Sequence, residues 1–273
     1  MSIGVDFPLY AVKFKPHYLS RSKTMKLSKH TVLVTGGSAG IGLELAREFK
    51  KHNNRVIICG RNAQRLASAA KEIGDIETIQ CDLAKEADIH ALMDTLKTKV
   101  GKLSILVNNA GVQQNYNFTQ VDPESTLNNI DWEIDVNFNA IVKLTTLCLP
   151  LLRQQCQSAI INISSGLALT PKRSAPVYCA TKAAVHIFSK AFRYQMEDTA
   201  PNIAVFEAIL PLVDTNMTRE RENKGKISPE QVAKEVFKAM ERDNYEIYVG
   251  KVKLLVLIQR VLPQLAERIL RNS

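Results

Sequence analysis

The 273-residue sequence contains no long hydrophobic run. Its longest apolar stretches, such as residues 254–258, reach five or six residues, whereas a helix needs about 20 apolar residues to cross a bilayer. The chain has 12 glycines, 10 prolines and 45% hydrophobic residues, which excludes collagen-like, low-complexity and wholly disordered proteins. The composition predicts one large domain with its own core and no transmembrane span.

Cysteine and histidine are also few. The five cysteines are odd in number and form no CxxC pair, which is typical of a reducing compartment and predicts a cytoplasmic protein. The five histidines show no ligand spacing, so no metal site is expected. Residues 1–25 are basic and mixed in character, without the apolar core of a signal peptide.

Positive charge is concentrated in the two end segments. The net charge is +9, and residues 1–29 hold six basic residues and residues 250–273 hold five, against one acidic residue in each segment. The stretch between them is neutral, which argues against a nucleic-acid-binding body. Contact with an anionic membrane surface stays open for the two end segments.

Apolar segments alternate with segments of helical periodicity after residue 29. Apolar residues spaced by three and four predict amphipathic helices, and the segments between them are apolar on both faces. Such strands, separated by helices, indicate a doubly wound, Rossmann-type parallel sheet with helices on both faces, whose ligands bind beyond the carboxyl ends of the strands. The expected strands are residues 31–35, 55–59, 76–80, 105–107, 159–163, 203–209 and 246–249.

The first expected strand runs into the sequence TGGSAGIG, which opens a helix. Glycine permits a tight turn and close approach of the backbone to a pyrophosphate, and the helix N-terminus offers free N–H donors. A turn that merely links strand to helix has the same composition, so nucleotide binding needs the support of further motifs. The candidate cofactor residues here are Gly36, Ser38, Ala39, Gly40, Ile41 and Gly42.

The end of the second strand bears on the choice of cofactor. An acidic residue there would bind the ribose hydroxyls of NAD, but Gly60 is followed by Arg61, whose guanidinium suits a 2′-phosphate. NADP(H) is therefore expected rather than NAD(H), with a solvated arginine as the alternative. Residues expected along the cofactor beyond the third and fourth strands are Asp82, Leu83, Asn109, Ala110 and Gly111. Asp82 could equally cap the helix that begins near Lys85.

A serine, a tyrosine and a lysine come later in the chain at a spacing that carries chemistry. Tyr178 and Lys182 lie four residues apart on one helix face, so the ammonium can stand beside the phenol and favour its ionised form. A carbonyl reduced by hydride needs a proton donor, and a tyrosine whose pKa is moved towards the working pH can supply it. Ser165, at a strand end 13 residues before Tyr178, could hold the carbonyl oxygen; Ser164 has the same chemistry, and only the spacing favours Ser165.

Together these motifs resemble the short-chain dehydrogenase/reductase family, whose patterns are TGxxxGxG, NNAG and a serine followed 13 residues later by YxxxK. The match extends from about residue 31 to residue 215. The resemblance implies a sheet of about seven strands, hydride transfer between a nicotinamide and a carbonyl or alcohol substrate, cofactor contacts from Tyr178 and Lys182, and a homodimer or homotetramer. It also implies a fourth catalytic residue, matched by Asn137, which helps to hold a water that links the lysine to solvent.

One segment departs from the family pattern. Where the family usually has Pro-Gly after the sixth strand, this chain has Pro211 followed by Leu212, which removes backbone freedom at that point. Pro211, Val213 and Thr215 still match the family's residues at the nicotinamide and phosphate. Residues 214–228 are charged and poorly periodic, and they suit either a mobile lid over the substrate or an exposed loop without a role in substrate choice.

The last segment combines an apolar stripe with basic residues. Pro263 predicts a kink or break in the helical pattern. Three interpretations remain: packing on the domain or in a subunit interface, an interfacial membrane helix, or a wall of an apolar substrate pocket. Packing of residues 254–261 against the edge of the last strand is the favoured one.

We interpret the chain as a basic extension (1–29), an NADP-binding catalytic domain (30–249) and a basic amphipathic tail (250–273). The expected function is NADP(H)-dependent oxidation or reduction of a small-molecule alcohol or carbonyl. A catalytically silent nucleotide-binding regulatory or scaffold protein is the alternative. The complete set of Asn137, Ser165, Tyr178 and Lys182 argues against that alternative, because a scaffold has no need of all four.

Overall fold

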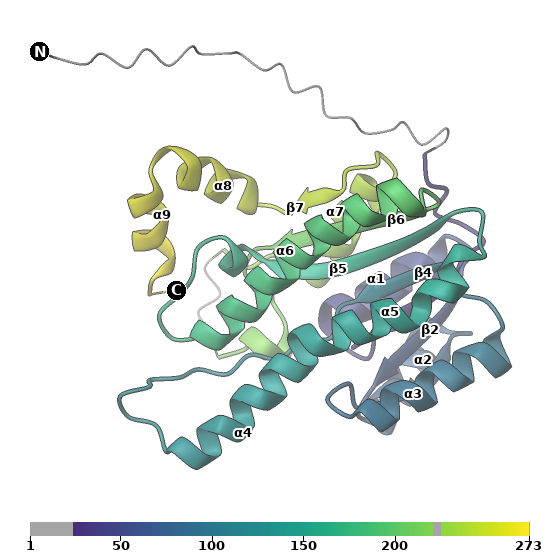
Figure 1. Cartoon of the computed structure of the whole chain (residues 1–273), viewed down its shortest axis with the longest axis horizontal. Helices are drawn as coiled ribbons and strands as arrows, with labels where there is room; N and C mark the ends of the chain where they lie inside the picture. Colours follow the sequence, from purple (N-terminus) through teal and green to yellow (C-terminus); the bar gives the residue numbers. More distant parts are fainter. Residues whose placement is uncertain (1–23, 221–224, 273) are drawn as a thin grey trace, which may run out of the picture.

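The computed structural model describes residues 24–220 and 225–272, and its strands form one parallel sheet (Figure 1). The strand order β3-β2-β1-β4-β5-β6-β7 reverses direction between β1 and β4, as in a doubly wound fold, so the predicted fold class is confirmed. Every predicted strand is present, with ends that agree within two residues. The strands are β1 (Thr31–Thr35), β2 (Arg55–Gly60), β3 (Glu77–Gln80), β4 (Ile105–Asn108), β5 (Ser158–Ser165), β6 (Ile203–Leu210) and β7 (Glu246–Tyr248).

Helices cover both faces of the sheet, because β1, β4, β5 and β6 are buried almost throughout and both of their faces need an apolar partner. The α-helices are α1 (Gly40–Lys51), α2 (Ala63–Ile73), α3 (Glu86–Thr95), α4 (Pro123–Ile134), α5 (Ala140–Arg153), α6 (Pro176–Thr199), α7 (Pro229–Met240), α8 (Val252–Val261) and α9 (Pro263–Leu270). Short π-helical segments follow α3 (Leu96–Val100) and α4 (Asp135–Asn139), and 3₁₀ turns lie at Gly166–Ala168 and Asn216–Thr218.

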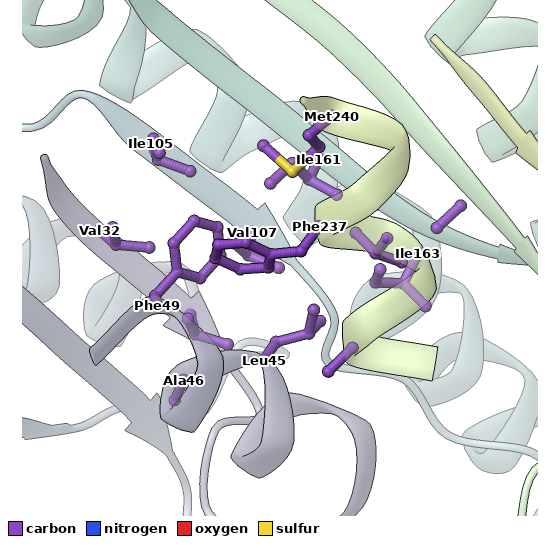
Figure 2. Packing of buried hydrophobic residues seen from close by; sticks show 14 of the residues in the cluster. Val32, Leu45, Ala46, Phe49, Ile105, Val107, Ile161, Ile163, Phe237 and Met240 are labelled. Atoms are coloured by element: carbon purple, nitrogen blue, oxygen red, sulfur yellow. The ribbon is translucent and has the colours of Figure 1, made fainter. Parts of the chain in front are cut away.

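The hydrophobic core has two layers, one on each side of the sheet. Helices α1, α2 and α7 bury one layer, in which Phe49 of α1 meets Phe237 of α7 edge to face, with ring centroids 4.6 Å apart. Figure 2 shows part of this layer, with Phe49 and Phe237 together with side chains of the sheet such as Val32 of β1 and Val107 of β4. Helices α3, α5 and α6 bury the other layer. The two layers hold the sheet rigidly, so the strand ends form a fixed frame for a site.

Part of the segment assigned to the basic extension packs on the domain. Met25 and Leu27 are buried in the layer beneath α1, and the Asn54 side chain donates to the Leu27 carbonyl at 2.8 Å. Residues 1–23 of that extension lie outside the described residues. The hydrophobic core of the domain therefore draws on residues before position 30.

The continuous helical stretch Pro123–Arg153 is long and apolar enough to cross a membrane by length and composition. The sequence predicted no such span, because no single apolar run is long. The stretch joins α4 and α5 through a π-helical segment, and 44% of its most apolar window is buried inside the protein. Core helices of soluble proteins meet the same criterion, so this is weak evidence for a membrane span.

The last two helices form an arm beyond β7, which we call the C-terminal collar (α8 and α9; yellow in Figure 1). Pro263 stands in the first turn of α9 and breaks the helix there, as predicted. The collar contacts the loop after β5: the Arg173 N–H donates to the Arg271 carbonyl at 3.0 Å, and the Gln259 side chain donates to the Leu169 carbonyl. Val252 and Ala266 are buried.

The favoured interpretation of residues 254–261, packing against the edge of the last strand, is not what the structure has. Leu254, Leu257 and Val261 are 57%, 59% and 68% exposed. The sequence pattern identified an apolar stripe correctly, but much of it is exposed, whereas Val252 and Leu255 of α8 lie against Gly166, directly after β5.

Candidate active site

A cavity of about 1120 Å³ lies where the fold predicts a ligand, beyond the carboxyl ends of the strands. The residues that directly follow strands β1 to β6 line it, and the collar lines it from the other side. Of the residues expected to hold cofactor or substrate, the cavity wall includes Gly36, Ser38, Ala39, Gly40, Ile41, Arg61, Asp82, Leu83, Asn109, Ala110, Gly111, Ser165, Tyr178, Lys182, Pro211, Val213 and Thr215. Gly42 and Asn137 are not part of the wall.

The glycine turn after β1 is built for close approach. Gly40 has φ +54°, and an added Cβ there would stand 3.2 Å from the Thr215 methyl group, so the turn and the loop after β6 meet across the cavity. A Cβ on Gly42 would collide with the Gly36 carbonyl oxygen, which explains why Gly42 serves the packing of α1 rather than the wall. No side chain caps α1, and its first turn holds no acidic residue. An uncapped helix start without acidic residues fits a pyrophosphate.

Thr35 ties the glycine turn to the NNAG segment. Its Oγ1 donates to the Val107 carbonyl at 3.1 Å and accepts from the N–H groups of Asn109 and Ala110 at 2.9 and 3.0 Å. The Asn109 side chain donates in return to the Thr35 carbonyl at 2.9 Å. These bonds fix the relative position of two loops that lie 74 residues apart in sequence. From the sequence, Thr35 was recognised only as part of a motif.

Two arginines flank the cavity near the end of β2. Arg61 is exposed, and its guanidinium carbon lies 5.0 Å from the centroid of the Trp132 ring on α4, a cation–π geometry. Arg65, one helical turn further along, also lines the cavity, and its N–H donates to the Asn62 side chain at 2.8 Å, which caps α2. Arg65 was not predicted from the sequence, because it lies inside α2 and only the structure shows that this part of the helix borders the cavity.

Asp82 lines the cavity and does not cap a helix. Helix α3 begins at Glu86, its N-cap residue is Lys85, and no side chain caps it. The Asp82 carboxylate instead accepts the Ala84 N–H at 3.2 Å, and the Asp82 N–H donates to the Asp88 carboxylate at 2.8 Å. The capping alternative for Asp82 is therefore wrong.

Tyr178 and Lys182 stand together in the wall, both on α6. The Lys182 Nζ lies 5.7 Å from the centroid of the Tyr178 ring and donates to the Ile163 carbonyl of β5 at 2.8 Å. Lys182 is 3% exposed, and this burial lowers its pKa to about 8, while the Glu207 carboxylate acts in the opposite direction. At neutral pH the ammonium is therefore still mostly protonated beside the phenol.

The two candidate serines are turned differently. The Ser164 hydroxyl is buried and donates to the Lys182 carbonyl at 3.4 Å, so it serves the packing of α6 on β5. Ser165 is less buried, and its Oγ accepts the Leu167 N–H at 3.1 Å at the start of a 3₁₀ turn. The motif spacing favoured Ser165, and in the structure Ser165 is also the less buried of the two serines.

Asn137 lies behind the wall, fully buried in the π-helical segment. Its side chain accepts from the Val112 N–H and donates to the Val112 carbonyl, both at 2.8 Å, and it also donates to the Thr181 hydroxyl at 3.2 Å. An added Cβ on Gly111 would lie 3.4 Å from Asn137 Oδ1 and 3.6 Å from Lys182 Nζ. Asn137 thus joins the loop that follows the NNAG segment to α6, next to Lys182. Both polar atoms of its side chain already make hydrogen bonds within the protein.

A buried carboxylate braces the same loop. Glu133, on α4, accepts from the Gln114 N–H at 3.2 Å and from the Tyr116 hydroxyl at 3.0 Å, and burial raises its pKa. Glu133 was not predicted from the sequence, because it is one of several acidic residues in this segment and nothing in its spacing sets it apart.

The loop after β6 has no conformational need for a glycine at the position where the family usually has one. Among the described residues Leu212 is not one of those with positive φ, so the backbone there needs no glycine freedom. The Ile227 N–H donates to the Leu212 carbonyl at 3.2 Å, and Val213 forms a bridge with Ile227, which fastens both ends of the expected lid segment. Four of its residues, 221–224, lie outside the described residues.

The collar supplies an apolar wall of the cavity. This agrees with the third interpretation of the tail, a wall of an apolar substrate pocket, which was not the favoured one. The collar residues that line the cavity are mainly aliphatic: Val252, Leu254, Leu255, Ile258, Ile269 and Leu270. Met217, in the loop after β6, lines the cavity as well.

Across residues 24–220 and 225–272, no group of three or more His, Cys, Asp or Glu residues could hold a metal ion.

The sequence and the fold match known proteins over most of the chain. The sequence model of the short chain dehydrogenase family matches residues 30–226. "Uncharacterized oxidoreductase DltE" of Bacillus subtilis is 44% identical over 200 residues, which cover 73% of this chain and 78% of that protein. "NADP-dependent 3-hydroxy acid dehydrogenase YdfG" of Salmonella typhi is 34% identical over 64% of this chain and 70% of that protein.

A solved structure agrees with the fold. A short chain dehydrogenase/reductase from Burkholderia phymatum in complex with NAD superposes with a TM-score of 0.78 at 18% identity, over 91% of this chain and 97% of that one. At this identity the likeness concerns the fold, and the cofactor of that protein does not decide the cofactor here.

Proposed function

This chain belongs to the short-chain dehydrogenase/reductase family, and on that premise we propose that it is an NADP(H)-dependent enzyme that interconverts a carbonyl compound and its alcohol. The observation that carries the proposal is the shared cavity. The glycine turn lies in one part of its wall, and Ser165, Tyr178 and Lys182 lie in another. A nucleotide-binding scaffold has no use for a buried lysine beside a tyrosine in that wall.

Each residue has a distinct part in this proposal. A bound nicotinamide supplies or accepts the hydride. Tyr178 gives a proton to the carbonyl oxygen, and Ser165 holds that oxygen by a hydrogen bond. The Lys182 charge favours the ionised form of the Tyr178 phenol and contacts the ribose, and Asn137 supports a proton path to Lys182.

NADP(H) is the proposed cofactor because two cationic side chains and no carboxylate follow β2. Arg61 and Arg65 both line the cavity, and the stack of Arg61 on Trp132 leaves its N–H edges open to a phosphate. The name of the Salmonella relative states NADP dependence, which supports the same choice.

The substrate that fits best is an apolar carbonyl compound of some length. The collar contributes aliphatic side chains to the cavity, and of the charged residues described beyond position 250, Lys251 alone is in the wall. Apolar lining favours a ligand that buries hydrocarbon rather than one that carries several polar groups.

Three further features support proposals about assembly and location. Exposed apolar side chains on α4 and α6, namely Leu127, Ile187 and Tyr194, support a homodimer or homotetramer. The five free cysteines support a cytoplasmic location. The tail that forms the collar combines exposed leucines with five basic residues, which supports weak peripheral contact with an anionic membrane. We expect weak co-sedimentation with vesicles of phosphatidylglycerol, lost in high salt; equal binding to phosphatidylcholine vesicles would argue against the charge contribution.

The function is tested by NADPH oxidation over a panel of ketones and aldehydes that includes long-chain members. We expect turnover that rises with the length of the apolar part, and a much weaker response with NADH. Tight NADPH binding in a fluorescence titration, without turnover of any compound in either direction, would instead support the regulatory alternative.

A further inference from the structure

A buried acidic residue lies close to the catalytic lysine, and the proposed chemistry does not use it. Glu207, on β6, is 1% exposed. Its Oε2 lies 2.8 Å from the Nδ1 of His186, and its Oε1 has no hydrogen-bond partner among the described residues. Burying a carboxylate is costly unless its charge is compensated, so a half-satisfied carboxylate needs an explanation.

The topology places Glu207 beside Lys182. His186 follows Lys182 by one turn of α6, so both side chains face the sheet from the same side of the helix. The Lys182 Nζ reaches the Ile163 carbonyl of β5, and Glu207 pairs in register with Asn162, the residue before Ile163. The Lys182 ammonium and the Glu207 carboxylate therefore both lie between α6 and the two adjacent strands β5 and β6.

Other charged groups surround this pair. Lys190 and Arg193 follow on α6, and the Arg193 guanidinium lies 3.5 Å from the carboxylate of Glu246 on β7, the register partner of Glu207. The Tyr248 hydroxyl donates to Glu246 at 2.8 Å. The Glu246 carboxylate thus has an ion pair with Arg193 and a hydrogen bond from Tyr248, whereas Oε1 of Glu207 has no hydrogen-bond partner among the described residues.

We propose that Glu207 is a positioning residue that keeps Lys182 protonated inside the protein, and that His186 fixes the Glu207 carboxylate in the orientation required for this. A buried carboxylate near a buried ammonium stabilises the charged form of the ammonium, because little water screens the two charges, and Glu207 does act against the effect of burial on Lys182. The inference rests on the role proposed above for Lys182, which must be cationic to make Tyr178 a better acid.

His186 makes the support depend on pH. The hydrogen bond with Glu207 raises the pKa of His186 above its usual value. Below that pKa the imidazolium neutralises the carboxylate, but Lys182 then needs no help to stay protonated. Above it His186 is neutral and Glu207 acts with its full charge, in the range where burial would otherwise remove the Lys182 proton. Glu207 and His186 together thus carry a net negative charge only above the pKa of His186, which is the range in which Lys182 would otherwise tend to lose its proton.

The test measures Lys182 directly and needs no substrate. Protein labelled with ¹³C at lysine Cε is titrated by NMR, and the Lys182 resonance is assigned by its loss in Lys182→Arg. We expect Glu207→Gln, which keeps size and an acceptor oxygen, to lower the Lys182 titration midpoint by at least about one pH unit. The matched control Glu246→Gln, one strand away, should leave the midpoint in place.

Glu207→Asp separates charge from packing. It retains the negative charge with one methylene fewer, so its midpoint should stay closer to the parental value than that of Glu207→Gln. Where a substrate is known, the alkaline limb of the kcat–pH profile for reduction should move by the same amount. An unchanged midpoint in Glu207→Gln, an equal shift in Glu246→Gln, or an equal shift in Glu207→Asp would overturn the proposal. Absence of turnover with a shifted midpoint would count against the reductase function alone.

Discussion

The cavity has a polar half and an apolar half that are held in different ways. In the polar half, Thr35 and Asn109 lock two loops together through hydrogen bonds between their side chains and the backbone, and the glycines leave little room for larger residues. In the apolar half, the collar is joined to the domain after β7 and tied again at the loop after β5. The difference between the halves suits the tasks proposed for them, because proton and hydride transfer need fixed geometry, whereas selection of an apolar ligand needs mainly shape and hydrocarbon.

The largest expected effect removes the proton donor from the polar half. Tyr178→Phe should lower kcat by about 10²–10⁴, the usual contribution of general acid–base catalysis, while NADPH affinity and binding of an apolar carbonyl persist. Single-turnover kinetics with a saturating substrate measures the change. Near-parental turnover would remove Tyr178 from the chemistry, and a parallel loss of NADPH binding would show that the substitution damaged the fold of the site.

The next effect concerns cofactor choice within the polar half. Arg61→Ala should weaken NADPH binding by about 10- to 100-fold, because a charge-assisted hydrogen bond contributes about 1.5–3 kcal/mol. NADH affinity should change little. Titrations of both cofactors decide the point, and Arg65→Ala measures how the two arginines share the phosphate. Equal weakening of NADPH and NADH would contradict phosphate recognition by Arg61.

The smallest effect belongs to the apolar half. Ile258→Ser should raise KM for a long-chain carbonyl about fivefold, the equivalent of about 1 kcal/mol of lost apolar burial, and leave kcat unchanged. Val261→Ser is the matched control, since Val261 is 68% exposed on the same helix and is not part of the cavity wall. A short-chain substrate should not distinguish the two variants. A kcat loss in Ile258→Ser would mean that the collar also positions the reacting groups.

The sequence predicts the polar half better than the apolar half for a physical reason. Glycine turns, strand ends and the spacing of Tyr178 and Lys182 are local, so their chemistry can be read from neighbouring residues. The orientation of α8 is set by the loop after β5, some 90 residues earlier, and its apolar stripe is compatible with several partners. Periodicity therefore indicates an amphipathic helix without indicating what faces it.

Residues that act over a distance in sequence were missed for the same reason. Glu133, Glu207 and Asn54 look like ordinary polar residues until the fold buries them and gives each a partner. For Asn137 the resemblance to the family found the position, but the hydrogen bonds that occupy its side chain required the structure. For Asp82 the local sequence suggested a role that the structure does not have. A helix cap was plausible from neighbouring residues, but Asp82 accepts the Ala84 N–H and does not cap α3.

The position of the collar also bears on how such an enzyme can change over evolutionary time. Its wall residues belong to two short helices that follow the last strand and carry none of the groups assigned to hydride or proton transfer. A point mutation there alters the width and length of the apolar space without disturbing Thr35, Asn109 or Lys182. New substrates can therefore be acquired by small steps in one terminal segment, while the tightly bonded part of the molecule is inherited unchanged.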